Sequence, residues 1–154
     1  NHSDMGTTLT AVLLIDGRAT VANVGDSRTY LWRGGALEQI TRDHSLVASL
    51  VAAGQLEPDA VYDHEQKGVI YRSVGESDDL RVDTFSVDLW PDDRLLLCSD
   101  GLWEMARDEG LAAVLAAETE PQAVCDRLVE AANRAGGEDN ISALVVWAAP
   151  VASS

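Results

Sequence analysis

Short apolar runs separated by turn residues fill the first part of the chain. Residues 7–15 and 18–24 are rich in Thr, Val, Ala and Leu, and Asp16-Gly17 between them is a typical two-residue hairpin turn. Two shorter runs follow at residues 29–32 and 36–40, with a glycine pair between them. This pattern predicts a meander of four antiparallel strands.

Beyond the fourth run the pattern changes to that of a helix. Asp43-His44-Ser45 is a favourable start for a helix over residues 46–53, and Gly54 is a favourable end. Residues 55–78 are polar, contain a proline and lack a sustained period. We predict that they form an irregular surface excursion, the kind of segment that often carries function.

The rest of the chain combines strands with longer helices. The expected elements are strands at 80–87 and 93–98, helices at about 102–107, 109–116 and 121–135, and a strand at 141–148. No helix separates the first four strands, which disfavours a parallel doubly wound sheet. The order predicts an α+β fold with antiparallel sheet packed by helices, and the length predicts one domain over residues 1–154.

Charge limits the classes of partner. The chain has 26 acidic and 11 basic residues, for a formal net charge of −15. Because no basic stripe is present, we expect neither nucleic-acid binding nor adhesion to an anionic membrane surface. Carboxylates favour cations instead, although a solvated acidic surface explains most of them.

The cysteines and the first residues indicate the cellular compartment and the completeness of the chain. Cys98 and Cys125 form no disulfide framework, and we expect two buried free thiols in a reducing compartment. No apolar run reaches membrane-spanning length and no signal peptide is recognisable, so the expected location is cytoplasmic. The first strand begins almost at once and without an initiator methionine, so we expect a fragment of a longer chain.

Three aspartates stand where apolar runs stop: Asp26, Asp100 and Asp139. Mg²⁺ and Mn²⁺ prefer oxygen ligands, and strand ends are rigid positions from which carboxylates can converge. Each aspartate alone has an ordinary alternative. Ser99 or Asp100 could cap the following helix, and the other two could be turn residues. Taken together, the three predict a metal site.

Other catalytic chemistry finds little support in this sequence. His44 beside Asp43 could form a dyad, but a helix-start residue in a satisfied hydrogen-bond network is the stronger interpretation. No serine lies in a nucleophile elbow, and the glycine pairs lack the spacing of a phosphate loop.

Six short motifs, in order, cover nearly the whole chain. They are Met5-Gly6-Thr7-Thr8, Val24-Gly25-Asp26-Ser27-Arg28, Ile40-Thr41-Arg42-Asp43-His44-Ser45, Arg72-Ser73-Val74-Gly75, Leu97-Cys98-Ser99-Asp100-Gly101-Leu102-Trp103 and Glu138-Asp139-Asn140-Ile141. In this succession the chain resembles the bacterial branch of the metal-dependent PP2C (PPM) serine/threonine phosphatases.

The resemblance implies a fold and a site. The fold would be a β-sandwich of two antiparallel sheets flanked by helices. Asp100 and Asp139 would act in catalysis as ligands of two central Mn²⁺ or Mg²⁺ ions, and Asp26 would join Asp100 in holding a third ion. Residues 55–78 would correspond to the family's flap, a segment linked to substrate choice.

The implied reaction is hydrolysis of phosphoserine and phosphothreonine in proteins by a metal-activated water. The implied partners are phosphorylated proteins, including a serine/threonine kinase. A non-catalytic PP2C-like module that binds a phosphoprotein is the alternative. The phosphatase branch of sporulation and stress regulators shares the fold, but the stretch from Gly25 to Ser45 fits the general bacterial branch better.

The chain departs from the family pattern at its start. The family's upstream Asp-Gly-x-Gly-Gly motif and an N-terminal phosphate-binding arginine do not occur in this sequence. We therefore expect an N-terminally incomplete domain with exposed strand edges, and dimerisation through those edges.

Overall fold

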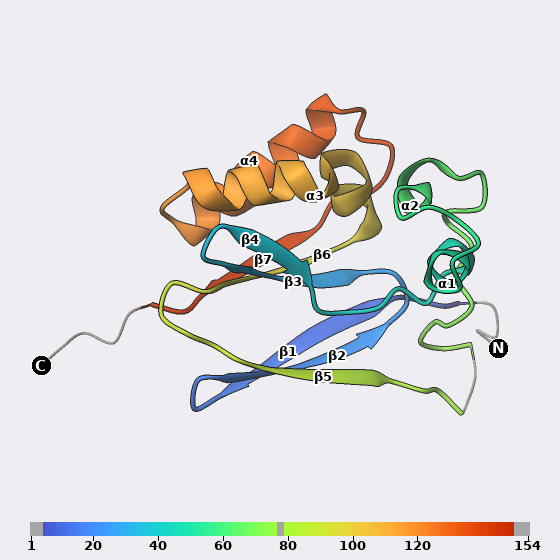
Figure 1. The fold of residues 1–154 in the computed structure, drawn as a ribbon, viewed down its shortest axis with the longest axis horizontal. Helices are drawn as coiled ribbons and strands as arrows, with labels where there is room; N and C mark the ends of the chain where they lie inside the picture. The colour runs from blue at the N-terminus through green and yellow to red at the C-terminus, as the bar shows by residue number, and fades with distance from the viewer. Residues whose placement is uncertain (1–4, 77–78, 150–154) are drawn as a thin grey trace, which may run out of the picture.

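Two antiparallel sheets lie face to face in the computed structural model, which describes residues 5–76 and 79–149 (Figure 1). One sheet has three strands in the order β1-β2-β5, and the other has four in the order β4-β3-β6-β7. The strands are β1 (Leu9–Ile15), β2 (Arg18–Val24), β3 (Arg28–Arg33), β4 (Ala36–Gln39), β5 (Asp83–Asp88), β6 (Arg94–Cys98) and β7 (Ala143–Trp147). The predicted sandwich of antiparallel sheets is confirmed.

The predicted four-stranded meander is wrong. The β1–β2 and β3–β4 hairpins form as expected, but β2 pairs with β5 and β3 pairs with β6. The chain crosses from one sheet to the other between Val24 and Arg28. Burial explains the crossing: β3 is buried along most of its length, whereas β2 alternates between buried and exposed residues. A strand buried on both faces needs cover on both sides, and among the described residues only the four-stranded sheet has helices over its outer face (Figure 1).

Helices α3 (Asp100–Ala117) and α4 (Pro121–Arg134) cover that outer face (Figure 1). Their apolar sides meet the sheet in one core, which includes Tyr30, Leu96, Cys98, Leu102, Trp103, Leu111, Leu115, Val124 and Leu128. Arg107 breaks α3 with φ 54° and ψ 164°, so the two predicted helices are present as two segments of one element. No helix in the described residues is long and apolar enough to cross a membrane.

Two short helices lie at one end of the sandwich, α1 (Leu46–Ala52) and α2 (Ala60–Asp63) (Figure 1). The Ser45 side chain caps α1 by accepting the Ala48 N–H at 3.3 Å. The expected excursion at 55–78 contains α2 and is otherwise irregular where the structure describes it. Both cysteines are free, as predicted, but only Cys98 is fully buried.

The outer face of the three-stranded sheet is apolar along β1. Leu9, Leu13 and Ile15 are 52%, 61% and 57% exposed. In the described ranges, β1 pairs with β2 alone and therefore forms a sheet edge. Exposed apolar edges of this kind favour association with another strand.

Candidate functional site

The turn that leaves β2 carries a buried carboxylate. Asp26 is only 6% exposed, and its carbonyl oxygen accepts the indole N–H of Trp103 at 2.9 Å. The pKa of Asp26 is raised to about 6, mainly by burial and next by the negative charge of Asp100. The two carboxylates, which are 74 positions apart in sequence (26 to 100), therefore lie close enough to repel each other.

Asp100 is the first residue of α3. Its Oδ1 accepts the N–H of Gly101 at 2.9 Å, and a carboxylate at this position is stabilised by the helix dipole. Ser99 is the N-cap residue, but its side chain makes no capping bond. Instead, its Oγ donates to the Asn140 carbonyl at 3.1 Å and accepts the Ser142 N–H at 3.0 Å. Ser99 thus joins the start of α3 to the loop before β7.

Asp139 lies in that loop and is exposed. Its Oδ1 accepts the N–H of Asn140 at 2.6 Å, which is the turn arrangement considered as its alternative. A Cβ added to Gly101 would lie 2.5 Å from the Asn140 carbonyl oxygen, so the loop rests directly on the first turn of α3. Only glycine allows this approach.

The structure thus sets the Asp26 turn against the first turn of α3, which begins at Asp100, and rests the loop of Asp139 on the same helical turn. Within residues 5–76 and 79–149, no three His, Cys, Asp or Glu side chains are arranged to hold a metal ion. The convergence of Asp26, Asp100 and Asp139 on one ion stays a prediction.

Glu104 is a further acidic residue beside this pair that the sequence interpretation missed. It follows Asp100 by four positions and so lies on the same helix face. Its charge contributes to the raised pKa of Asp26, and burial raises the pKa of Glu104 itself. Lys67 from the 55–78 segment pairs with it at 2.7 Å. The i, i+4 acidic spacing was the available signal.

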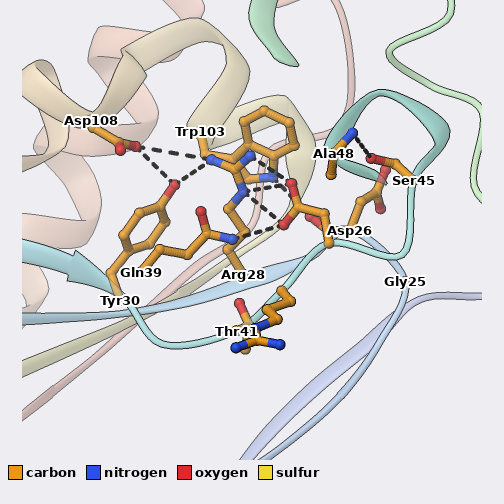
Figure 2. A network of polar contacts seen from close by, with 12 residues as sticks. Gly25, Asp26, Arg28, Tyr30, Gln39, Thr41, Ser45, Ala48, Trp103 and Asp108 are labelled. Carbon is orange, nitrogen blue, oxygen red and sulfur yellow. Dashed lines mark hydrogen bonds and ion pairs between the residues drawn. The ribbon is translucent and has the colours of Figure 1, made fainter. Parts of the chain in front are cut away.

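A buried ion pair joins Arg28 to Asp43, and its Arg28 side chain lies beside Asp26 and Trp103 (Figure 2). The Arg28 guanidinium donates to both Asp43 oxygens, at 2.6 to 3.1 Å, and to the Tyr30 hydroxyl at 2.7 Å. It also stacks on Trp103, with 3.4 Å from its central carbon to the ring centroid. Because Trp103 also bonds the Asp26 carbonyl, the network fixes the turn against α3.

His44 does not form a dyad with Asp43, whose oxygens are taken by Arg28 and Gln39. Its ring contacts Gly25 and Asp83, so the expectation of a satisfied network at the helix start is confirmed. A cavity of about 660 Å³ opens beside it, between α1, α2 and the four-stranded sheet. Its lining includes Arg28, Asp43, His44, Tyr62, Tyr71 and Arg72.

Sequence comparisons decide the family. A family described as Stage II sporulation protein E (SpoIIE) matches residues 1–148. The serine/threonine phosphatase stp of Listeria monocytogenes is 39% identical over 142 residues, covering 92% of this chain and 56% of that protein. The protein phosphatase PhpP of Streptococcus pneumoniae is 42% identical over 145 residues, covering 94% and 59%. The chain belongs to the bacterial PP2C-type (PPM) family.

A solved PP2C structure supports the same assignment. The catalytic domain of the serine/threonine protein phosphatase PstP, in complex with two manganese ions, is 36% identical, with a TM-score of 0.84. The match covers 93% of this chain and 59% of that one. The PP2C chain described here therefore spans a little more than half the length of these three relatives.

The residues present fit a hard divalent cation of the kind PP2C proteins use. Asp26 and Asp100 offer carboxylate oxygens, the ligand type that Mn²⁺ and Mg²⁺ prefer. No basic side chain in the described residues forms an ion pair with Asp26, and its raised pKa reflects a buried charge without a counter-ion. A cation at this position would compensate that charge.

Proposed function

We propose that this chain is part of a phosphatase that hydrolyses phosphoserine and phosphothreonine in proteins with Mn²⁺ or Mg²⁺. The observation that carries the proposal is the 2.9 Å hydrogen bond from Trp103 to the Asp26 carbonyl, which holds the Asp26 turn against the first turn of α3, where Asp100 lies. Membership of the PP2C family and the manganese complex of the relative PstP support it.

Each predicted aspartate has a role in this proposal. Asp100 and Asp139 would hold two central ions, and Asp26 with Asp100 would hold a third. Bound ions would neutralise charge on the phosphoryl oxygens and lower the pKa of a bound water. The chain itself holds the carboxylates: Trp103 fixes the Asp26 carbonyl, and Ser99 fixes the loop of Asp139 against α3.

The substrates would be phosphorylated proteins, including a serine/threonine kinase. The relatives stp and PhpP carry the name of phosphatase, which supports this substrate class. The apolar edge strand β1 supports a second property, self-association of this chain through strand pairing.

One observation favours a second candidate function, a non-catalytic module that binds a phosphoprotein. The cavity of about 660 Å³ beside His44 includes Arg42 and Arg72 in its lining. Guanidinium groups bind phosphate without a metal, so this cavity could recognise a phosphoprotein surface.

The test is hydrolysis of a phosphothreonine peptide by this chain, with and without Mn²⁺. We expect metal-dependent turnover that falls by roughly 100-fold or more in Asp100→Asn and Asp139→Asn, because ligand loss costs at least as much as loss of a supporting residue. Asp126→Asn, an exposed aspartate on α4, is the matched control. Binding of the phosphopeptide without turnover would favour the second candidate.

A further inference from the structure

His44 joins the Asp26 turn to two other segments of the chain. It is 2% exposed, and its ring Nδ1 accepts the N–H of Gly25 at 3.0 Å. Its Nε2 lies 3.1 Å from Asp83 Oδ2, at the start of β5. Arg72, near the end of the 55–78 segment, donates to the other Asp83 oxygen at 2.8 Å.

The contacts determine the tautomer. A backbone N–H only donates, so Nδ1 carries no proton, and a neutral imidazole must then carry it on Nε2. Arg72 Nη1 also lies 3.0 Å from Nε2, but a guanidinium only donates, and its protons have acceptors in Asp83 Oδ1 and the Arg81 carbonyl. The Nε2 proton is therefore donated to Asp83 Oδ2. Both ring nitrogens are engaged in a buried site, so His44 is not available to transfer protons to or from a substrate. Its role must lie in what it holds.

The His44 backbone makes a second set of links between the same segments. Its N–H donates to the Gly25 carbonyl at 2.9 Å, and its carbonyl accepts the Tyr71 N–H at 3.0 Å. Two residues further on, the Leu46 N–H donates to the Val69 carbonyl at 2.9 Å. His44 therefore contacts the turn that carries Asp26 and, in the 55–78 segment, Tyr71 and Arg72.

The Gly25 turn depends on such outside contacts. Gly25 has φ +99°, and an added Cβ would lie 2.4 Å from Thr8 Cγ2, so no side chain can anchor it. The His44 ring is the acceptor of its buried N–H. A buried donor without an acceptor is costly, so loss of Nδ1 would shift the turn and the carboxylate that follows it.

We propose that His44 is a positioning residue that sets the Asp26 carboxylate through Nδ1 and residues 69–72 of the 55–78 segment through Nε2 and Asp83. The first half rests on the proposed function, since it concerns a carboxylate assigned to metal. The two halves use different ring atoms and can be separated by substitution.

Two isosteric variants separate them. Asn places its side-chain oxygen near the position of Nδ1, and Gln places its amide near the position of Nε2. In the metal-free chain we expect His44→Asn to keep the Gly25 amide protected against hydrogen exchange and to speed proteolysis within 55–78. We expect His44→Gln to keep the segment resistant to protease and to lose protection at Gly25.

Mn²⁺ titration of the same variants measures the consequence for the carboxylate. We expect Mn²⁺ affinity within about twofold of wild type in His44→Asn and weakened roughly 10- to 100-fold in His44→Gln, the range for residues that orient ligands. Asp83→Asn provides a second, milder test of the Nε2 half: it should loosen the segment and leave Gly25 protected.

Equal loss of both protections in the two variants, or no loss in either, would overturn the proposal. If His44→Gln does not fold, an Asp83→Asn variant with an unchanged segment overturns it instead. The exchange and proteolysis measurements use no metal and no substrate. A failure of Mn²⁺-dependent hydrolysis would therefore count against the proposed function and leave this positioning role standing.

Discussion

Lys67 Nζ lies 2.7 Å from Glu104 Oε2, in a pair whose side chains are 28% and 14% exposed. The contact joins the 55–78 segment to α3, one helical turn beyond Asp100. The negative charges of Glu104 and Asp100 both raise the pKa of Asp26. Lys67 therefore places a positive charge next to Glu104, which is one of the carboxylates that act on Asp26.

Removing that charge should strengthen cation binding. In Lys67→Met the Glu104 carboxylate loses its counter-ion, and we expect Mn²⁺ affinity to rise roughly two- to fivefold at low salt, the scale of a partly exposed ion pair. Calorimetric titration measures it. Arg134→Met, which breaks an exposed pair with Glu130, is the control and should leave affinity unchanged. Weaker binding in Lys67→Met would contradict this account.

Breaking the buried ion pair between Arg28 and Asp43 should destabilise the fold. Arg28→Met leaves the buried Asp43 carboxylate without its partner, which costs about 3–5 kcal/mol of unfolding free energy. Urea unfolding followed by tryptophan fluorescence measures the loss. Arg18→Met, at an exposed 3.8 Å pair with Asp88, should change stability by no more than about 0.5 kcal/mol. Equal effects in the two variants would refute the assignment of Arg28.

Asp93 should contribute to acid sensitivity. Desolvation acts to raise its pKa, but hydrogen bonds from Arg33 and from the Trp90 N–H outweigh it, so the folded pKa is lowered. A lowered folded pKa contributes stability that is present above the unfolded value, about 4, and is lost as pH falls through the folded value. We expect Asp93→Asn to flatten the fall in unfolding free energy below about pH 4. Arg33→Met should flatten it too; an unchanged slope in both variants would exclude this pair as the source.

The exposed apolar face of β1 should drive self-association. We expect Leu13→Lys to lower the apparent mass measured by light scattering at high protein concentration, because a charge on an edge strand opposes pairing. Thr20→Lys, on the exposed face of neighbouring β2, is the matched control and should have a smaller effect. A wild-type chain that stays monomeric across the concentration range would exclude edge pairing.

Local signals predicted much of the fold. Asp16 and Gly17 both adopt positive φ, as the hairpin sequence requires, and Ser45 caps α1 through its side chain. The choice of sheet for β3 could not be predicted in the same way. It depends on α3 and α4, which lie far along the chain and pack over Tyr30 and Leu96.

In the candidate site, too, some residues could be predicted from the sequence and their long-range contacts could not. Asp26 and Asp100 could be selected from sequence because each ends an apolar run. The partners of His44 could not, because Gly25 and Asp83 lie 19 and 39 positions away and carry no pairing signal. Long-range hydrogen bonds of this kind are fixed by the packing of the two sheets and not by local propensity.

The break in α3 at Arg107 divides the helix into two mechanical parts. A residue with φ 54° and ψ 164° interrupts the helical hydrogen-bond ladder, and the Arg107 side chain is held outside by Asp63 at 2.9 Å. The part before the break carries Asp100 and Glu104, and the part after it is packed through Leu111 and Leu115. Each part is therefore anchored in the hydrophobic core on its own, the first through Leu102 and Trp103 and the second through Leu111 and Leu115.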